Sequence, residues 1–240
     1  MGRKPVKKWM TGFGAIVMAL SLAGCGSQES GNTAMPSVPP SLENVTETKP
    51  VTEDGISAAI ESSAETDKIL IAYFTWAENA ADTSRVDANT SASVQAPGNV
   101  ARMAAWIQQE TGGDLFSIRV EEPYSADYDE CLDRAADEKA ENARPVLVEK
   151  VLDMAGYDTV FLGYPNWWYS APMAVFSFLE ENDLSGKKVV LFCSHGTGGL
   201  ASSVKDISAV LPDSEIETNV LGVYRDDIPE CQETINNWQE

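Results

Sequence analysis

Two compact apolar runs constrain the fold of this chain more than any other feature. Residues 159–162 and 189–193 are each too short for a typical helix, and a loop rich in aromatic or glycine residues follows each run directly. Continuous apolar runs of this length are typical of strands that are buried on both faces, as in parallel sheets covered by helices. The sequence therefore predicts an α/β domain in which both runs are buried strands.

Strands and helices are predicted to alternate through residues 68–240. Further apolar runs predict strands at residues 69–74, 115–120 and 215–223. Apolar residues at helical spacing predict helices at residues 100–107, 128–142, 173–179, 202–211 and 228–238, and residues 146–154 fit either a short helix or an extended piece. Because right-handed crossovers place helices on both faces of a sheet, the five strands predict a three-layer, doubly wound fold.

The N-terminus has the pattern of a bacterial secretion signal. Residues 2–9 carry four basic side chains and no acid, and residues 10–20 form an apolar stretch too short for a stable membrane span. Small residues before Cys25 resemble a lipobox, in which the cysteine is acylated and becomes the mature N-terminus. We expect residues 1–24 to be a lipoprotein signal peptide and the protein to be extracytoplasmic and lipid-anchored at Cys25. An ordinary secretory signal with an incidental cysteine is the alternative.

The segment after Cys25 has the composition of a tether. Residues 26–67 are rich in Ser, Thr, Pro, Glu and Val, contain a single basic residue and lack aromatic side chains. Such a segment cannot bury enough apolar area to offset the entropy of ordering. Residues 25–67 are therefore predicted to be a disordered tether, and residues 68–240 a single domain of ordinary size.

Charge and cysteine content exclude several classes of function. The formal net charge of −20 argues against binding to nucleic acid or to anionic lipid surfaces, so the lipid alone would hold the protein at the membrane. Cys131, Cys193 and Cys231 remain once Cys25 is lipidated, and this odd number argues against a disulfide framework, although one pair could form. With a single histidine and no Cys-x-x-Cys, we expect no metal site.

Four motifs together resemble those of flavodoxins and of related small bacterial flavoproteins and quinone reductases. They are residues 69–75 (Ile-Leu-Ile-Ala-Tyr-Phe-Thr), 112–116 (Gly-Gly-Asp-Leu-Phe), 163–168 (Gly-Tyr-Pro-Asn-Trp-Trp) and 194–199 (Ser-His-Gly-Thr-Gly-Gly). The resemblance covers essentially residues 68–240. It implies a flavodoxin-like fold with strand order 2-1-3-4-5 and non-covalent FMN at the carboxyl edge of the sheet.

The chemistry of FMN assigns a part to each motif. The phosphate needs hydroxyls and the N–H groups of a helix N-terminus, for which the candidates are Thr75, Gly98, Asn99 and Val100. The flat ring needs aromatic faces, and the candidates in the aromatic loop are Pro165, Asn166, Trp167, Trp168 and Tyr169. Trp76, which directly follows Thr75, is a further candidate that could cover the ring. The pyrimidine edge needs closely approaching backbone groups, for which the candidates are Ser194, His195, Gly196, Thr197, Gly198 and Gly199. His195 is either a catalytic proton donor to reduced flavin or an ordinary loop histidine.

The predicted phosphate loop departs from the flavodoxin pattern. Residues 76–97 separate Thr75 from Gly98, and Val100 stands where a hydroxyl is expected. Either this insertion loops out and the chain returns at Gly98, or phosphate binding is weakened or lost. Acidic residues near the ring would lower the second reduction potential of the flavin.

The sequence favours a membrane-anchored FMN flavoprotein in electron transfer or flavin-dependent reduction. Its partners would be redox proteins or small electron acceptors such as quinones. The alternative is a tethered protein that keeps the fold but binds another small ligand without redox activity. A hydrolase using Ser170 or Ser194 with His195 is disfavoured because the chain lacks a Gly-x-Ser-x-Gly elbow.

Overall fold

The computed structural model describes residues 67–82 and 95–238. The predicted signal peptide, the lipidation site Cys25 and nearly all of the predicted tether lie outside the described residues. Within the described part of the chain, no helix combines the length and the apolar character that a membrane span requires.

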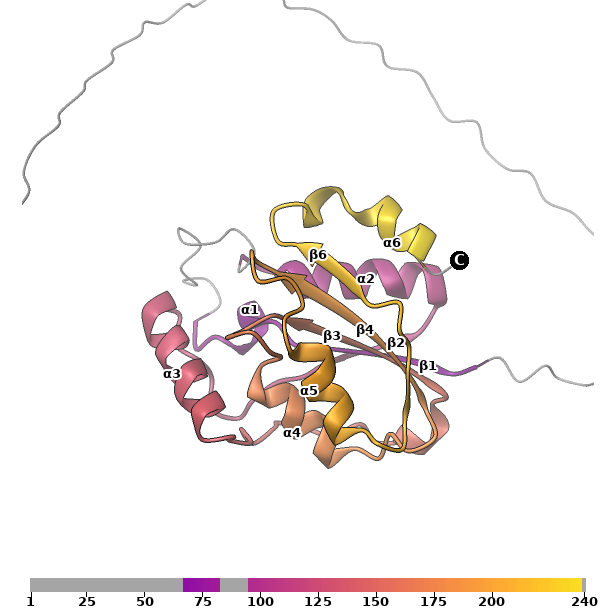
Figure 1. Cartoon of the computed structure of the whole chain (residues 1–240), viewed down its shortest axis with the longest axis horizontal. Coiled ribbons are helices and arrows are strands. Elements are labelled where there is room, and N and C mark those ends of the chain that lie inside the picture. The colour runs from indigo at the N-terminus through magenta and orange to yellow at the C-terminus, as the bar shows by residue number, and fades with distance from the viewer. Residues whose placement is uncertain (1–66, 83–94, 239–240) are drawn as a thin grey trace, which may run out of the picture. The chain divides into compact units, whose positions relative to one another are not determined.

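The core of the fold is a parallel sheet (Figure 1). Its strands are β1 (Ile69–Tyr73), β2 (Asp114–Ser117), β3 (Thr159–Pro165), β4 (Lys188–His195), β5 (Glu215–Ile216) and β6 (Leu221–Tyr224). The order is β2-β1-β3-β4-β5, β6 also pairs with β4, and every pair is parallel. The predicted doubly wound fold and its strand order 2-1-3-4-5 are thereby confirmed.

Helices cover both faces of the sheet. They are α1 (Trp76–Asn79), α2 (Asn99–Thr111), α3 (Tyr128–Ala140), α4 (Met173–Glu181), α5 (Ser203–Val210) and α6 (Gln232–Trp238), with 3₁₀ turns at Met154–Gly156 and Ile228–Glu230. In Figure 1, α2 and α6 lie on one face, and α4 and α5 lie on the other. Helix α2 ends at Thr111 and is capped by Gly112, which has a left-handed backbone (φ 71°) and whose N–H donates to the Gln108 carbonyl, as expected of a glycine stop.

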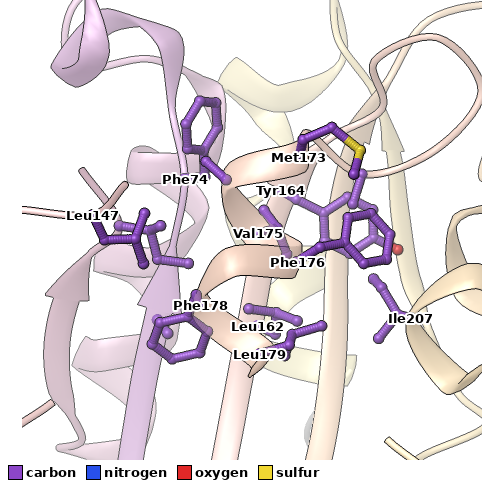
Figure 2. Close-up of a cluster of buried hydrophobic side chains, with 14 of the residues drawn as sticks. Phe74, Leu147, Leu162, Tyr164, Met173, Val175, Phe176, Phe178, Leu179 and Ile207 are labelled. Atoms are coloured by element: carbon purple, nitrogen blue, oxygen red, sulfur yellow. The ribbon is translucent and has the colours of Figure 1, made fainter. Parts of the chain in front are cut away.

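The pleat of the strands divides the core between the two faces. Leu70, Leu162 and Leu191 point to the α4 and α5 side. Figure 2 shows Leu162 there among side chains of α4 and Ile207 of α5. Their neighbours Phe161 and Phe192 point to the α2 and α6 side. Because successive side chains of a strand alternate between faces, strands covered on both sides must be apolar throughout, which is the pattern that predicted them.

Two predicted strands differ from the structure for local reasons. The run at 215–223 is split into β5 and β6, because the Glu217 carboxylate accepts the N–H groups of Thr218 and Asn219 and stabilises a turn between them. The second strand ends at Ser117 rather than at residue 120. There the side chain of Asn79, on the unpredicted helix α1, donates to the Ile118 carbonyl and accepts the Val120 N–H.

Two further segments also differ. The predicted closing helix begins as the 3₁₀ turn Ile228–Glu230, which contains a proline, and continues as α6. Of residues 146–154, Leu147 forms an isolated antiparallel bridge with Val120 and Met154 opens a 3₁₀ turn, and the rest of the segment is irregular.

Candidate functional site

A cavity of about 390 Å³ lies where the loops after β3 and β4 meet, beyond the carboxyl ends of both strands. This is the usual place for ligands in open α/β sheets, and the volume lies within the range of small-molecule sites. Its lining comes from α1, α3, both loops and the residue after β6: Trp76, Tyr128, Cys131, Leu132, Ala135, Asn166, Trp167, Trp168, Tyr169, Gly196, Thr197, Gly198, Gly199 and Arg225.

The aromatic loop contains a strained turn. The N–H groups of Trp167 and Ser170 donate to each other's carbonyls at 2.9 and 3.0 Å, and the two central residues, Trp168 and Tyr169, have φ values of 48° and 67°. Positive φ at both central positions is typical of a type I′ turn, which glycine and asparagine normally occupy. An L side chain in this conformation costs roughly 1–2 kcal/mol, so the surrounding structure must hold the turn in place.

Contacts from α3 and from the start of α5 hold this turn. The indole N–H of Trp168 donates to the Leu132 carbonyl of α3 at 3.1 Å, and the Lys139 ammonium of α3 donates to the Trp168 carbonyl. On the other side, the N–H and the hydroxyl of Ser202 both donate to the Tyr169 carbonyl, at 3.1 and 2.8 Å. The turn is therefore fixed from both flanks.

Asp206 of α5 supports the same turn through two serines. Its Oδ2 accepts the hydroxyls of Ser170 and Ser202, both at 2.6 Å. Burial raises the pKa of the Asp206 carboxyl, but the two hydroxyl donors and nearby lysines outweigh burial, and the pKa lies below its ordinary value. The carboxylate therefore stays charged at neutral pH. Sequence reasoning missed Asp206, because nothing in its own segment distinguishes it from other surface acids.

The three aromatic residues of the loop point in different directions. Trp167 packs edge-on against Phe74 and Tyr124, with ring centroids 5.4 and 5.5 Å away. Trp168 is 41% exposed and Tyr169 is 66% exposed. Trp167 thus forms the floor of the cavity, whereas Trp168 and Tyr169 have free ring surface at its rim.

The glycine loop is open to the cavity and tied to the aromatic loop. The Gly199 N–H donates to the Gly196 carbonyl at 3.2 Å, and Gly199 has a φ of 60°. Asn166 joins the loops, because its side-chain amide donates to the Gly199 carbonyl and its backbone N–H donates to the Ser194 carbonyl. A β-carbon added at Gly198 would lie 3.5 Å from the Tyr169 ring, so the backbone there approaches the rim closely.

The two halves of the predicted phosphate loop touch. Gly98 precedes α2 with a φ of 88°, and a β-carbon added there would lie 2.2 Å from Oγ1 of Thr75. The Asn99 amide donates to the Arg225 carbonyl at 2.9 Å and, more weakly, to the Ser194 hydroxyl at 3.4 Å. The chain therefore returns to Thr75 at Gly98, with residues 83–94 outside the described part.

The structure divides the predicted cofactor residues into two groups. Those that line the cavity are Trp76, Asn166, Trp167, Trp168, Tyr169, Gly196, Thr197, Gly198 and Gly199. Those that do not are Thr75, Gly98, Asn99, Val100, Pro165, Ser194 and His195. Of these, Val100 has its side chain in the core and Pro165 ends β3.

His195 turns toward β6 rather than into the cavity. Its Nδ1 lies 2.8 Å from the Gly196 carbonyl, and a β-carbon added at Gly222 would lie 3.3 Å from its Nε2. The hydroxyls of Ser170 and Ser194 have Asp206 and Asn99 as partners. This arrangement lacks the serine–histidine contact that the hydrolase alternative needs.

Helix α3 supplies one side of the cavity, which sequence reasoning did not foresee. Tyr128, Cys131, Leu132 and Ala135 recur at helical spacing, but spacing alone does not say what a helix faces. Burial raises the pKa of the Cys131 thiol to about 12, so this cysteine is not a nucleophile at neutral pH. All three described cysteines are free and buried.

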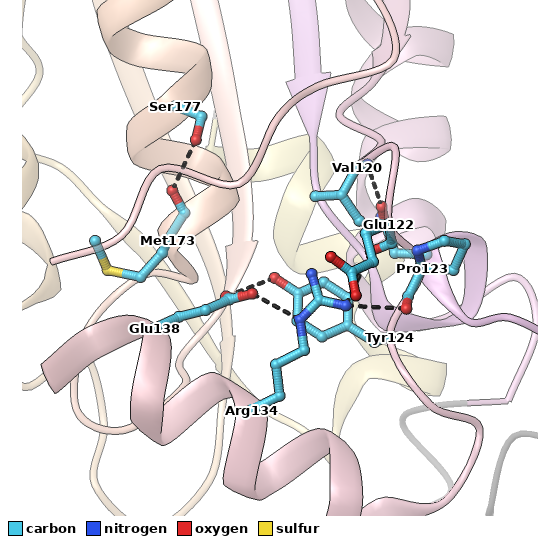
Figure 3. Close-up of polar contacts among 9 residues, drawn as sticks. Val120, Glu122, Pro123, Tyr124, Arg134, Glu138, Met173 and Ser177 are labelled. Atoms are coloured by element: carbon cyan, nitrogen blue, oxygen red, sulfur yellow. Dashed lines mark hydrogen bonds and ion pairs between the residues drawn. The ribbon is translucent and has the colours of Figure 1, made fainter. Parts of the chain in front are cut away.

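A buried polar cluster fixes α3 in this position (Figure 3). The Tyr124 hydroxyl and the Arg134 Nε both donate to the Glu138 carboxylate at 2.8 Å. The Arg134 guanidinium also lies 4.1 Å from the centroid of the Tyr124 ring and donates to the carbonyls of Glu122 and Pro123. Since Tyr124 contacts Trp167, the cluster links α3 to the cavity floor.

Within residues 67–82 and 95–238, no group of three or more His, Cys, Asp or Glu side chains is placed to hold a metal ion.

Comparisons with known proteins identify the family. Among solved structures, a protein of Bacteroides eggerthii assigned as a flavoprotein is 28% identical, with a TM-score of 0.52 over 70% of this chain and 97% of that one. Another from Bacteroides uniformis is 25% identical, with a TM-score of 0.55 over 73% and 99%. A Lactobacillus acidophilus flavoprotein solved in complex with FMN shares 20% identity and the fold, with a TM-score of 0.50 over 72% and 99%.

The comparison with curated proteins finds no match. The flavodoxin family model matches residues 68–238, which is most of the chain and the whole of the described sheet with its helices. The chain therefore belongs to the flavodoxin family.

Proposed function

We propose that this protein binds FMN non-covalently in the cavity and serves in electron transfer or flavin-dependent reduction outside the cytoplasm. One observation carries the proposal. The strained aromatic turn at 167–170 and the glycine loop at 196–199 meet around a ligand-sized cavity at the carboxyl edge of the sheet. The two Bacteroides relatives, assigned as flavoproteins, and the family itself agree with it.

The residues of the cavity fit the isoalloxazine ring. The ring is flat and needs aromatic faces, and Trp168 and Tyr169 have exposed ring surface at the rim. Its polar edge needs backbone groups, and Gly196, Gly198 and Gly199 leave the backbone of their loop accessible. The strain of the turn is consistent with a binding role, because strained backbone is typical of functional sites.

The start of α2 fits the phosphate. The first N–H groups of a helix lack partners within the helix and lie at its positive end, which favours an anion. The Thr75 hydroxyl lies directly beside Gly98 at this end, and only glycine leaves room for it. The phosphate would thus be held by Thr75 and by the backbone of residues 98–100, without a cationic side chain.

Bound FMN would supply the redox chemistry, since a flavin accepts and donates electrons singly or in pairs. The chain would bind and orient it. Trp168 and Tyr169 would cover the ring and exclude water, and Trp167 would support it from below. Asn166 would keep the two loops at a fixed separation, and Asp206 would hold the turn through its serines.

We further propose that the protein is a lipoprotein anchored through Cys25, with residues 25–67 as its tether. Its electron donors and acceptors would then be redox proteins or small molecules such as quinones near the membrane. Replacing Cys25 by alanine should move the protein from the membrane fraction to the soluble fraction. Retention of the C25A variant in the membrane fraction would exclude a lipid anchor at this residue.

Flavin titration of the purified full chain tests the main proposal. We expect saturable, one-to-one FMN binding, seen as a shift of the flavin absorption spectrum and quenching of flavin fluorescence. Thr75→Val should weaken FMN binding while leaving riboflavin binding unchanged, because riboflavin lacks the phosphate. Thr111→Val, at the other end of the same helix, is the matched control. Absence of flavin binding would favour the non-redox ligand-binding alternative, and bleaching of bound flavin by NAD(P)H would distinguish a reductase from a carrier.

A further inference from the structure

The charge of the cavity differs from that of the whole chain. The chain has a formal net charge of −20, yet none of the described residues that line the cavity is Asp or Glu. Among those lining residues the charged side chain is Arg225, which directly follows β6. Among the described residues, the cavity lining therefore lacks the acidic side chains that would lower the second reduction potential of a flavin bound there.

The backbone of Arg225 is fixed at the edge of the sheet. Its N–H donates to the His195 carbonyl at 2.9 Å, which continues the pairing of β6 with β4. Its carbonyl accepts the side-chain amide of Asn99, at the start of α2. Arg225 thus stands between the glycine loop and the helix end proposed for the phosphate.

The guanidinium of Arg225 faces the open side of the glycine loop. A β-carbon added at Gly196 would have Nη1 of Arg225 as its sole neighbour within 4 Å among the described residues, at 4.0 Å. The Nε atom is buried and has no hydrogen-bond partner in the described part of the chain. The nearest ion-pair partner is Oδ1 of Asp226 at 3.8 Å, which is too long for a hydrogen bond, and that side chain is 63% exposed. The positive charge is therefore only weakly compensated within the protein.

We propose that Arg225 raises the reduction potential of FMN bound in this cavity. The inference rests on the proposed function. It adds that the charge acting on the bound group is positive and comes from Arg225. Two electrons from a donor and one proton from solvent add one net negative charge to the bound group. A nearby guanidinium stabilises that added charge and so favours the reduced form over the oxidised form.

Other charged groups near the loops do not replace Arg225 in this role. The Lys139 ammonium donates to the Trp168 carbonyl, and the Asp206 carboxylate accepts two serine hydroxyls. Neither Lys139 nor Asp206 lines the cavity. Asp226 opposes the effect of Arg225 at a distance. Neutralising Asp226 should therefore shift the potential in the direction opposite to that of neutralising Arg225.

The test measures the affinity of the full chain for oxidised and reduced FMN, by anaerobic titration with dithionite as the reductant, together with the potential against a reference dye. Arg225→Gln should weaken the binding of reduced FMN at least tenfold more than that of oxidised FMN. For a two-electron couple this ratio is a fall of about 30 mV in potential. Arg225→Lys should retain most of the effect, and Asp226→Asn should raise the potential. Arg119→Gln removes the same charge from an exposed ion pair with Glu149 and should change nothing.

The outcomes separate this proposal from the one on which it rests. If the wild-type chain does not bind FMN, both proposals fail. If FMN binds but Arg225→Gln changes the two affinities equally, Arg225 holds the group without tuning it and the inference is overturned. An equal shift from the Arg119→Gln variant would also overturn it, because the effect would then arise from net charge rather than from position.

Discussion

Two fully buried tyrosines allow a charged and a neutral hydrogen-bond acceptor to be compared, within one protein, by what each hydrogen bond contributes to the free energy of unfolding. Tyr124 and Tyr164 are both 0% exposed. The Tyr124 hydroxyl donates to the Glu138 carboxylate at 2.8 Å, whereas the Tyr164 hydroxyl is hydrogen-bonded to the neutral Ser203 hydroxyl at 3.0 Å. We predict that Tyr124→Phe destabilises the protein about twice as much as Tyr164→Phe.

The magnitudes follow from the charge of the acceptor. A hydrogen bond to a charged group contributes about 1.5–3 kcal/mol and a neutral one about 0.5–1.5 kcal/mol, so we expect about 2 and about 1 kcal/mol respectively. Tyr124→Phe also removes one donor from Glu138, but Arg134 remains its partner. For a domain of this size, the expected falls in Tm are about 4–8 °C and about 2–4 °C.

Urea unfolding of the two variants, followed by circular dichroism, measures both free energies. The slope with denaturant should stay at the wild-type value, because phenylalanine keeps the ring and the surface exposed on unfolding is unchanged. FMN binding should persist in Tyr124→Phe, since the ring that contacts Trp167 is retained. A loss for Tyr164→Phe equal to or larger than that for Tyr124→Phe would refute the reasoning.

Two further predictions concern strain and pH. Tyr169→Gly should raise the stability of the flavin-free protein by about 1 kcal/mol, because glycine adopts the left-handed backbone of residue 169 without strain. The same variant should bind FMN more weakly. If urea unfolding shows the variant to be less stable than the wild type, the inference that this turn is strained is wrong. Burial, and then the Glu78 carboxylate that accepts its hydroxyl, raise the pKa of Tyr73 to about 12 from the ordinary value of 10.0. The unfolded chain therefore releases this proton first, so the stabilising contribution of the neutral phenol is present below pH 10 and is lost as the pH rises toward 12. Between these two pH values, the urea midpoint of Tyr73→Phe should fall less steeply with pH than that of the wild type. Equal dependence on pH in both proteins would show that Tyr73 does not cause the loss of stability.

Much of the fold could be predicted from the sequence because its strands are buried on both faces. The run at 159–162 forms the first part of β3, the run at 189–193 forms the middle of β4, and Gly112 caps the end of α2 as expected. The split of the fifth strand could not be foreseen. It depends on the Glu217 carboxylate, which accepts backbone N–H groups that would otherwise be available to pair with a neighbouring strand.

The parts of the candidate site whose chemistry is visible in a local motif were predicted from the sequence. The parts that reach the site only through packing were missed. The aromatic and glycine loops are recognisable from residue type, and both line the cavity. Their neighbours on α3 and the residue Arg225 carry no local signal, since an amphipathic helix and a surface arginine occur in most domains. The inward direction of Trp167 could not be predicted either, because it depends on contacts with Phe74 and Tyr124, which are distant in the sequence.

The sequence by itself determined the strand runs, the loops that follow β3 and β4, and the alternation that leads to a doubly wound sheet. These features are local, because burial on two faces and the conformational needs of turns act on neighbouring residues. Only the tertiary structure decided that Thr75 meets Gly98, that α3 closes one side of the cavity and that Arg225 supplies its charge. Those contacts join segments far apart in the chain, and their geometry arises when the helices pack on the sheet rather than from any one segment.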